Sequence, residues 1–436
     1  MAKVAFHTLG CKVNHYESEA MMDLFKKRGY EIVEFNELAD VYVVNSCTVT
    51  NEAARKSRQL ARKARRLNPE AVVALVGCYT QVAPEEVKGI EGVDIFLGTS
   101  NRSHIVEYVE EFQNLGITNI EIVKRQELSE FEDLRVESLQ ETTRAYVKIE
   151  EGCNQFCSYC IIPYARGPVR SRTAESVIEE VGELVGKGVK EIILTGTHLG
   201  AYGTDWGKED SLEKLILQLL DIDGLEHIRL SSIEVTEITD GIIDIMASES
   251  KLCPHLHLPL QSGSEKILKL MRRPYDKTEF RAVVKKIREK IEDIAITTDI
   301  IVGFPGEDER AFQESYDFVK EMNFSRLHVF PFSRREGTPA ARMKDQIPAE
   351  QKKEYSSKML QLNEELMANY QKRFIGTIRP VIVEENRDHE TNLLTGMTDN
   401  YLRVLLDEDS SYTGKLVNVR LLRSHNHENL IGELVK

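Results

Sequence analysis

The sequence Cys153-Asn-Gln-Phe-Cys157-Ser-Tyr-Cys160 has the spacing C-x3-C-x2-C. Three thiolates hold three irons of a [4Fe–4S] cubane, which normally takes four thiolates, so one iron stays open to another ligand. The alternative is a zinc knuckle or a buried cysteine cluster, but a structural zinc ion takes four protein ligands and no other His or Cys stands near enough in the sequence to complete the set. The spacing therefore favours an iron–sulfur cluster with one reactive iron.

The length and the cysteine count limit the class of protein. A chain of 436 residues allows about two to four domains, each large enough for its own core. The number of cysteines, seven, is odd, and their spacing is not that of the disulfide framework of a small secreted protein. This layout favours metal or redox use of the thiols over disulfide bonds.

The sequence also indicates where the protein acts. The segment MAKVAFHTLGC lacks a basic region followed by an apolar run, and no segment approaches about eighteen uninterrupted apolar residues. We therefore expect a cytoplasmic protein without a membrane partner. The net charge of −14 argues against nucleic-acid binding over the whole surface, so any RNA contact must come from local basic patches.

Residues 1–126 are predicted to form an α/β domain. Apolar runs such as KVAFHTLG, DVYVVNS and AVVALVG alternate with helical patterns, which indicates a mostly parallel sheet with helices on its faces. Ligands of such sheets bind beyond the carboxyl ends of the strands. Three thiols follow directly on predicted strands, and we expect them to converge there as a second cluster with one open iron: Cys11, Cys47 and Cys78. The alternative is three buried cysteines that act as small apolar side chains.

A basic helix is predicted after Cys47, with Asn51 as its N-cap. No acid follows Glu52 until Glu70, so the basic residues on one face are expected to repel one another unless a polyanion neutralises them. The alternative is an ordinary solvated helix. We favour RNA binding by Arg55, Arg58, Arg62, Arg65 and Arg66.

Residues 127–143 are acidic and are predicted to link this domain to a second one, residues 144–374. Six β/α units in the second domain predict a barrel or partial barrel, whose active site should lie at the carboxyl ends of its strands. The cysteine loop follows the first of these strands directly. The predicted strands span residues 144–150, 190–195, 227–233, 255–260, 295–303 and 325–332.

Other predicted strand ends carry small or polar residues that suit a flat cofactor with a ribose or amino acid moiety. Each is weak by itself, because loops of any barrel are rich in Gly and Ser. The candidates for cofactor binding are Thr195, Gly196, Ser231, Ser232, Glu234, Gln261 and Gly303. Cys253 precedes the fourth strand, so it should lie at the opposite mouth of the barrel with a structural role or none.

The tail is predicted to be one long amphipathic helix over residues 346–374, followed by a β-rich segment, residues 375–436. About five short strands in this segment indicate a small OB-like barrel, an architecture often used to bind oligonucleotides. Its local charge is slightly acidic, which leaves a purely structural role as the alternative.

The order of these parts resembles the methylthiotransferase family of radical S-adenosylmethionine (SAM) enzymes over essentially the whole chain. Three short segments resemble most closely the branch that acts on N6-threonylcarbamoyladenosine in tRNA: Thr8-Leu-Gly-Cys11-Lys-Val-Asn14, Asn45-Ser-Cys47-Thr-Val-Thr50 and Gly152-Cys153-Asn154. The resemblance implies an N-terminal parallel-sheet α/β domain, a central partial (β/α)6 radical SAM barrel and a C-terminal TRAM domain for tRNA binding.

The resemblance also implies two [4Fe–4S] clusters. One, ligated by Cys153, Cys157 and Cys160, would bind SAM, with Tyr159 near its adenine. The other would be an auxiliary cluster, where sulfur is activated, on the thiols of Cys11, Cys47 and Cys78. One SAM would donate a methyl group to this sulfur, and another would yield a 5′-deoxyadenosyl radical that abstracts hydrogen from C2 of adenosine 37. No general base is implied.

The implied partners are tRNA at position 37 of its anticodon loop, an electron donor protein and a sulfur source. A threonylcarbamoyl group carries a carboxylate, for which a buried site needs a cation. The arginines expected on or near the catalytic face are Arg166, Arg170, Arg334 and Arg335. Alternatives are a methylthiotransferase for isopentenyladenosine 37 of tRNA or for an aspartate of a ribosomal protein, and a non-enzymatic Fe–S module that binds tRNA.

Overall fold

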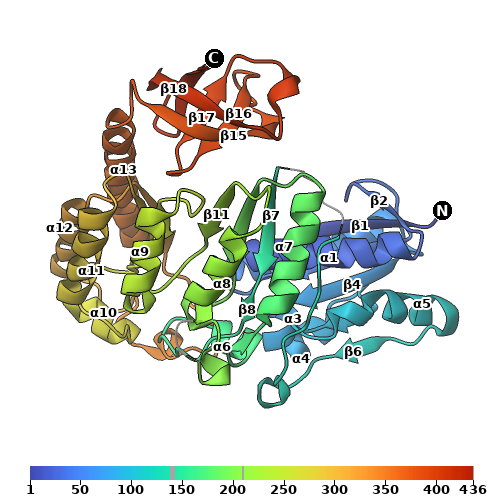
Figure 1. The fold of residues 1–436 in the computed structure, drawn as a ribbon. Helices are drawn as coiled ribbons and strands as arrows, with labels where there is room; N and C mark the ends of the chain where they lie inside the picture. The colour runs from blue at the N-terminus through green and yellow to red at the C-terminus, as the bar shows by residue number, and fades with distance from the viewer. Residues whose placement is uncertain (138–142, 209–210, 436) are drawn as a thin grey trace.

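The computed structural model describes residues 1–137, 143–208 and 211–435. Figure 1 shows a six-stranded sheet at the N-terminal end, central strands with their helices, and a small barrel at the C-terminal end. The predicted α/β class, the repeated β/α units and the terminal barrel are therefore confirmed.

The N-terminal sheet is parallel throughout, with the strand order β2-β1-β3-β4-β5-β6. Every residue of β3 and β4 is buried, because helices cover both faces of the sheet. Apolar residues of α1 and α5 pack on one face, and the alanines of α2 pack on the other. The strands are β1 (Lys3–Thr8), β2 (Glu31–Val33), β3 (Val41–Ser46), β4 (Val72–Gly77), β5 (Ile95–Leu97) and β6 (Asn119–Glu121). The helices are α1 (Lys12–Lys27), α2 (Asn51–Leu67), α3 (Cys78–Val82), α4 (Pro84–Lys88) and α5 (Ile105–Leu115).

The segment predicted as a linker, residues 127–143, is packed along residues 127–137. Leu134 and Val136 are buried against Tyr16 and Ala20 of α1. The Tyr16 hydroxyl donates to the Leu134 carbonyl oxygen at 2.6 Å. The Val136 N–H donates to Glu180 Oε1 of the central region at 3.0 Å, so the described part of this segment contacts both neighbouring regions. Residues 138–142 lie outside the described residues.

The six predicted central strands are present in chain order. They form two parallel three-stranded sheets, β7-β10-β11 and β12-β13-β14, which a bridge between Ser232 and His257 joins. One large apolar core lies between these strands and their helices. The strands are β7 (Arg144–Lys148), β10 (Glu191–Thr195), β11 (His227–Leu230), β12 (His255–His257), β13 (Ala295–Val302) and β14 (Arg326–Pro331). The main helices are α7 (Ala174–Gly186), α8 (Ser211–Leu220), α9 (Asp240–Ser248), α10 (Glu265–Met271), α11 (Lys277–Lys290) and α12 (Glu309–Met322).

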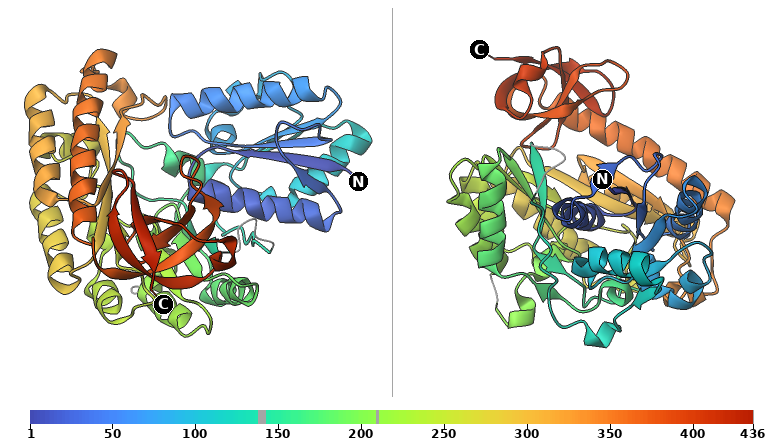
Figure 2. Two further views of the ribbon diagram at one scale, coloured as in Figure 1. Left: turned by 90° about the horizontal axis from the view of Figure 1, so that it is seen from above. Right: turned by 90° about the vertical axis from the view of Figure 1, so that its right-hand side faces the viewer.

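A long helix, α13 (Ala349–Lys372), leads from the central strands to the C-terminal barrel, which Figure 2 shows seated over one end of these strands. The barrel is closed in the order β15-β16-β17-β19-β18. Arg229 of β11 donates to the carbonyl oxygens of Thr398 and Asp399, so the barrel docks at the N-terminal ends of the central strands. Its strands are β15 (Ile378–Arg387), β16 (Leu394–Thr398), β17 (Arg403–Leu406), β18 (Leu416–Ser424) and β19 (Asn429–Leu434).

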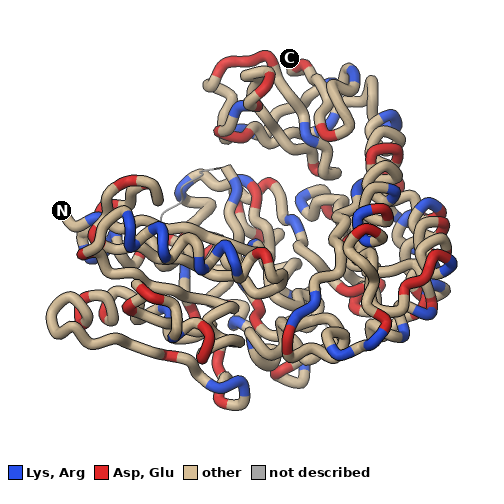
Figure 3. The backbone as a smooth tube through the Cα atoms, turned by 180° about the vertical axis from the view of Figure 1, so that it is seen from behind, with Lys and Arg blue, Asp and Glu red and all other residues tan. Residues whose placement is uncertain are grey.

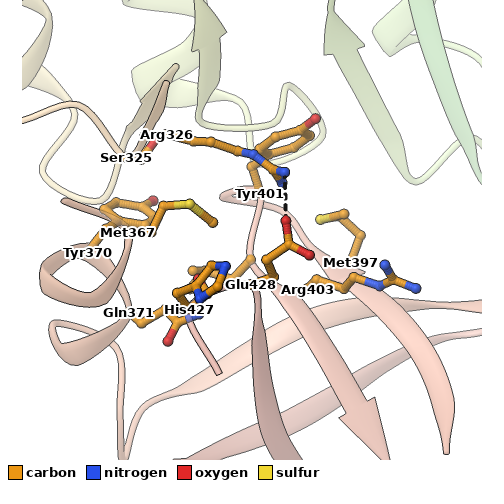
Figure 4. Close-up of a pocket in the computed structure, with 11 residues that line it drawn as sticks. Ser325, Arg326, Met367, Tyr370, Gln371, Met397, Tyr401, Arg403, His427 and Glu428 are labelled. Carbon is orange, nitrogen blue, oxygen red and sulfur yellow. Dashed lines mark hydrogen bonds and ion pairs between the residues drawn. The ribbon is translucent and has the colours of Figure 1, made fainter. Parts of the chain in front are cut away.

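A cavity of about 190 Å³ lies in the seam between α13, the start of β14 and the barrel. Figure 4 shows the ion pair of Arg326 with Glu428 across it, at 3.0 Å, and the His427 ring beside Gln371. Because β14 starts here, the cavity belongs to the end of the strands opposite the cysteine loops.

Among the described residues, no helix is both long and apolar enough to cross a membrane.

Candidate active site

The first group of thiols lies in the loop between β8 (Glu150–Glu151) and α6 (Ile162–Arg166), and we call it the loop triad: Cys153, Cys157 and Cys160. The Ser158 N–H donates to the Met271 carbonyl oxygen at 2.9 Å, which ties the loop to α10. Gly152 enters the loop with φ of 98°, and a Cβ there would overlap the carbonyl oxygen of Pro168. Only glycine fits this position, so the backbone before the first thiol is closely fixed.

The second group follows three strands that are neighbours in the sheet, β1, β3 and β4, and we call it the strand-end triad: Cys11, Cys47 and Cys78. Gly10 has φ of 119°, and a Cβ there would lie 3.1 Å from the Cβ of Cys47. Gly10 therefore allows the loops after β1 and β3 to approach each other. Burial raises the pKa of Cys78 to about 12. The predicted convergence of these strand ends is present in the structure.

The spacing within both triads suits a cluster better than a single metal ion. Thiolates around one zinc ion, each at about 2.3 Å from it, would lie about 3.8 Å apart. In neither triad do all three sulfur atoms lie within 4.8 Å of one another, and all six cysteines are among the described residues. A cubane spreads its thiolates more widely, because each binds a different iron. The residues present therefore fit a [4Fe–4S] cluster at each triad.

Two basic side chains adjoin the loop triad. The His198 Nδ1 lies 3.6 Å from the Cys153 Sγ, and the Arg273 Nη1 lies 3.3 Å from the Cys157 Sγ. Burial lowers the pKa of His198, but hydrogen bonds with Cys153 and Glu237 outweigh this effect and raise it to about 11. Positive charge at these positions favours the thiolate form that binds metal. His198 was not predicted from the sequence, although its place just after β10 was an available signal.

The residues predicted to bind SAM lie at the carboxyl ends of the central strands, as expected from their sequence positions. The Tyr159 hydroxyl lies 3.5 Å from the Arg273 Nη1, and Glu234 forms an ion pair with the same arginine. Gln261 and Gly303 both have positive φ, which marks sharp turns after β12 and β13. These positions let the backbone face the space above the strands, but their role toward SAM stays a prediction.

Buried polar atoms without partners mark the same region. Among the described residues, the hydroxyls of Thr197 and Ser231 and one carboxyl oxygen of Glu150 are buried and have no hydrogen-bond partner. Thr195 is buried, and a Cβ on Gly196 would lie 2.7 Å from Glu150 Oε2. Burial raises the pKa of Glu150 to about 8. Buried polar groups without partners need the hydrogen bonds that a polar ligand can supply, so the region fits SAM. Glu150 was not predicted from the sequence as a site residue.

A buried charge cluster joins the two triads. It comprises Glu17, Arg102, Lys148, Glu151 and Arg166, each at most 1% exposed. Arg166, at the end of the helix after the loop triad, lies 2.7 Å from Glu17 and 2.8 Å from Glu151. It also donates to Asn14 Oδ1 at 2.7 Å, and Asn14 lies 3.6 Å from the Cys11 Sγ. The cluster therefore fixes the strand-end triad relative to the loop triad.

This arrangement corrects the expectation that Arg166 and Arg170 bind a substrate carboxylate. Arg166 is committed to Glu17 and Glu151 inside the protein. Arg170 is 3% exposed and donates to the backbone carbonyls of Glu130, Arg166 and Pro168. Arg334 is exposed, and Arg335 is buried beside the strand-end triad. Glu17, one of the two carboxylates that pair with Arg166, is 149 residues away in the sequence and could not be recognised from it.

The structure also corrects the N-terminus of α2. Thr50 is the N-cap, and its hydroxyl accepts from the Ala53 N–H at 3.1 Å. Asn51 instead bonds outward, because its Nδ2 donates to the Arg334 carbonyl oxygen at 3.0 Å. The residue predicted to cap the helix therefore connects α2 to the loop after β14.

Three of the five arginines predicted to bind RNA are paired with acids. Arg55 pairs with Glu52 within α2 at 2.5 Å, and Arg58 and Arg65 pair with residues of later elements, Glu86 at 2.7 Å and Asp94 at 2.5 Å. Arg62 and Arg66 are exposed and lie in a hollow of about 670 Å³. The hollow, here the basic hollow, is lined by His7, Leu9, Lys56, Gln59, Leu60, Arg62, Lys63 and Arg66. Figure 3 shows the Lys and Arg positions along α2 on the face opposite that of Figure 1.

Cys253 lies where it was predicted, before β12 and away from both triads. It is fully buried, and its ligand atom lies within 4.8 Å of those of Glu191 and His227. Glu191 already accepts two hydrogen bonds from Arg229, at 3.1 Å each. This cationic partner opposes a metal ion at the same carboxylate, so the group suits a structural role.

Comparisons with known proteins agree with this arrangement. Residues 3–98 match the family described as Uncharacterized protein family UPF0004, and residues 147–319 match the Radical SAM superfamily. Among solved structures, the radical S-adenosylmethionine methyltransferase TsrM from Kitasatospora setae is similar, with a TM-score of 0.57 at 16% identity. The similarity covers 78% of this chain and 77% of that chain, and at this identity it concerns the fold alone.

Relatives of known name match almost the whole chain. The threonylcarbamoyladenosine tRNA methylthiotransferase MtaB of Bacillus subtilis is 45% identical over 97% of this chain and 94% of the relative. MtaB of Aquifex aeolicus is 40% identical, with 96% and 99% covered. A tRNA-2-methylthio-N(6)-dimethylallyladenosine synthase of Clostridium botulinum is 36% identical, with 98% and 95% covered. With both of its cysteine triads in place, this chain belongs to the radical SAM tRNA methylthiotransferase family.

Proposed function

We propose that the protein converts N6-threonylcarbamoyladenosine at position 37 of tRNA to its 2-methylthio derivative. The observation that carries this proposal is the identity of 45% over 97% of the chain to a methylthiotransferase named for threonylcarbamoyladenosine. The relative named for dimethylallyladenosine is 36% identical over a similar length. The two triads supply thiolates for the cofactors of such a reaction.

Six cysteines would hold two [4Fe–4S] clusters: the loop triad the one that binds SAM, and the strand-end triad the auxiliary one. When bound, the clusters and SAM supply the one-electron chemistry that an unactivated aromatic C–H bond requires. The chain orients them and excludes water. His198 and Arg273 place positive charge beside the loop triad, and the buried hydroxyl of Ser231 is available to a polar cofactor.

The tRNA would lie against the basic hollow of α2. Arg62 and Arg66 are exposed there, and Leu9 of the hollow stands two residues before Cys11. Phosphate groups would neutralise these like charges and release counterions. The C-terminal barrel, whose five-stranded architecture suits oligonucleotide binding, offers a second contact. An electron donor protein and a sulfur source complete the partners, and the cytosol is where the reaction would take place.

The test is mass spectrometry of tRNA nucleosides from a strain that lacks this gene. We expect loss of 2-methylthio-N6-threonylcarbamoyladenosine and accumulation of its precursor, and a plasmid copy of the gene should restore the product. If the 2-methylthio-isopentenyl nucleoside disappears instead, the enzyme belongs with the relatives named for dimethylallyladenosine. A strain with both nucleosides intact would point to the ribosomal-protein or non-enzymatic alternatives.

A further inference from the structure

Arg335 is a buried cation that has no carboxylate partner among the described residues. Its side chain lies in the loop after β14 and is 9% exposed. The Nη1 donates to Asn51 Oδ1 and the Nη2 to Thr48 Oγ1, both at 2.6 Å, and the Nε has no partner among the described residues. Both acceptors are neutral. A buried charge that is hydrogen-bonded but not paired is costly, so its position calls for an explanation.

The other buried arginines show that the fold normally supplies a carboxylate. Six arginines are buried among the described residues, and all except Arg335 have a carboxylate oxygen within 4.0 Å of a guanidinium nitrogen. The five pairs are Arg102 with Glu17, Arg166 with Glu17, Arg170 with Glu151, Arg172 with Asp133 and Arg229 with Glu191. Among the negative groups whose charge reaches Arg335, Cys47 of the strand-end triad has the largest effect, and Glu86, which comes next, is bound to Arg58 at 2.7 Å.

The loop that carries Arg335 touches both cysteine-bearing regions. Thr48, which accepts its hydrogen bond, follows Cys47 of the strand-end triad. The Ala340 N–H of the same segment donates at 2.8 Å to the carbonyl oxygen of Ser158, inside the loop triad. The Thr338 hydroxyl donates to the Arg335 carbonyl oxygen at 2.7 Å, and this hydrogen bond fixes the backbone of the segment. A base that reacts between the two triads would therefore lie close to this segment.

The chemistry of the guanidinium defines what it binds. It has five N–H donors in a planar fork, and its two side-chain bonds leave one N–H free on each terminal nitrogen. This arrangement suits an oxyanion, and a carboxylate can accept both bonds. A threonylcarbamoyl substituent carries a carboxylate, whereas an isopentenyl substituent has no charge. Thr48 and Asn51 keep the fork in place before the substrate arrives.

We propose that Arg335 is a specificity-determining residue that binds the carboxylate of the N6 substituent of the substrate adenosine. This inference rests on the proposed function and goes beyond it, because it identifies the carboxylate as the group that is recognised and Arg335 as the residue that recognises it. A phosphate of the RNA backbone has similar chemistry, and the test separates the two sources.

The test uses the full-length protein with its clusters reconstituted under anaerobic conditions. Two anticodon stem–loop RNAs serve as substrates, one with N6-threonylcarbamoyladenosine at position 37 and one with its methyl ester, which is neutral. Affinity is measured by fluorescence anisotropy, and kcat/KM by mass spectrometry of the product nucleosides. We expect the wild-type protein to prefer the acid by about a hundredfold in kcat/KM, because the ester leaves the arginine unpaired.

In Arg335→Gln, the preference should fall to within about threefold, while turnover of the ester stays near the wild-type value. Arg335→Lys keeps the charge but not the fork and should recover part of the preference. Arg334→Gln is the matched control, since Arg334 is the exposed neighbour, and it should keep the full preference. Iron content reports whether each variant is folded and loaded.

Two outcomes would overturn the inference. If Arg335→Gln loses acid and ester turnover equally, the arginine is structural or binds a phosphate. If the wild-type protein converts acid and ester equally well, no residue reads the carboxylate, although the proposed function stands. A wild-type protein that converts neither RNA but methylthiolates an isopentenyl RNA would instead refute the proposed function.

Discussion

At the scale of single residues, the candidate site depends on groups that cannot be exchanged without a specific loss. Gly152 is one example, because any side chain there would overlap the carbonyl oxygen of Pro168 and displace the loop triad. Arg273 is another, since it contacts Cys157 and pairs with Glu234 at the same time. Both act beside the thiols, so their effects should appear in the metal content of the protein.

The cysteines give the most direct prediction at this scale. Replacing Cys153, Cys157 and Cys160 together with Ala should lower the iron content of reconstituted protein from about eight atoms per chain to about four, because only the strand-end triad remains. SAM cleavage should be lost. Iron analysis and product chromatography measure the two effects.

Cys253→Ala is the matched control for the cysteine variants. This thiol is buried and lies outside both triads, with its sulfur atom within 4.8 Å of the side-chain ligand atoms of Glu191 and His227. The variant should keep its full iron content and its SAM cleavage. Equal iron loss in Cys253→Ala and in the triple variant would mean that the triads are not the ligands.

At the scale of elements, α2 shows how one helix can combine two roles. Its alanines pack on the sheet, and Arg65 ties its C-terminal turn to Asp94 before β5. Its exposed face carries Arg62 and Arg66 in the basic hollow. The paired arginines therefore stabilise the fold, and Arg62 and Arg66 are available to bind RNA.

The corresponding prediction concerns salt dependence. Arg62→Gln with Arg66→Gln should weaken tRNA binding and lower the slope of log K against log salt by about two, roughly one for each phosphate that the variant no longer neutralises. Fluorescence anisotropy over a range of salt concentrations measures this slope. Arg55→Gln is the matched control, because Arg55 is paired with Glu52, and its slope should match the wild type. Identical slopes in all proteins would mean that α2 is an ordinary solvated helix that does not bind RNA.

At the scale of the whole molecule, the buried charge cluster connects the N-terminal sheet to the central strands. Glu17 of α1 is within 3.2 Å of Arg102, Lys148 and Arg166, and all four side chains are at most 1% exposed. Such a cluster does not by itself add much stability, but removing one partner leaves buried charges uncompensated. It therefore specifies one relative position of the two triads.

Glu17→Gln should destabilise the protein by about 3–5 kcal/mol, because three buried cations then face one carboxylate fewer. Urea unfolding of the metal-free protein measures the difference. Glu137→Gln, which removes an exposed pair with Lys27, is the control and should change stability by less than about 1 kcal/mol. Equal effects of the two variants would show that the cluster does not hold the regions together.

The same glutamate makes the difference between wild type and Glu17→Gln depend on pH. Burial alone would raise the pKa of Glu17, but Arg102, Arg166 and Lys148 lower it from 4.5 to about 2. A lowered pKa in the folded state stabilises the protein above pH 4.5, and this contribution, about 3 kcal/mol, is lost as the pH falls toward 2. The difference between the two proteins should shrink over this range and be constant at higher pH.

The sequence by itself determined the local features of this protein. The C-x3-C-x2-C spacing, the cysteines at strand ends and the alternation of apolar runs are short-range patterns, and the strands and cysteine positions they predicted are present. The five-stranded closed barrel was likewise expected from the spacing of its strands and turns. These features can be read because hydrogen bonding and side-chain periodicity act within a few residues.

Only the tertiary structure decided which charges are satisfied. Arg166 meets Glu17, 149 residues away, and Arg335 meets Thr48, 287 residues away, so neither environment is encoded nearby. From the sequence alone, Arg166 and Arg335 have the same expected place near the catalytic face. In the fold, Arg166 lies against carboxylates and Arg335 against neutral acceptors. Electrostatic pairing depends on distance in space and on burial, not on order along the chain, and for that reason only the fold shows which of these arginines is paired with carboxylates.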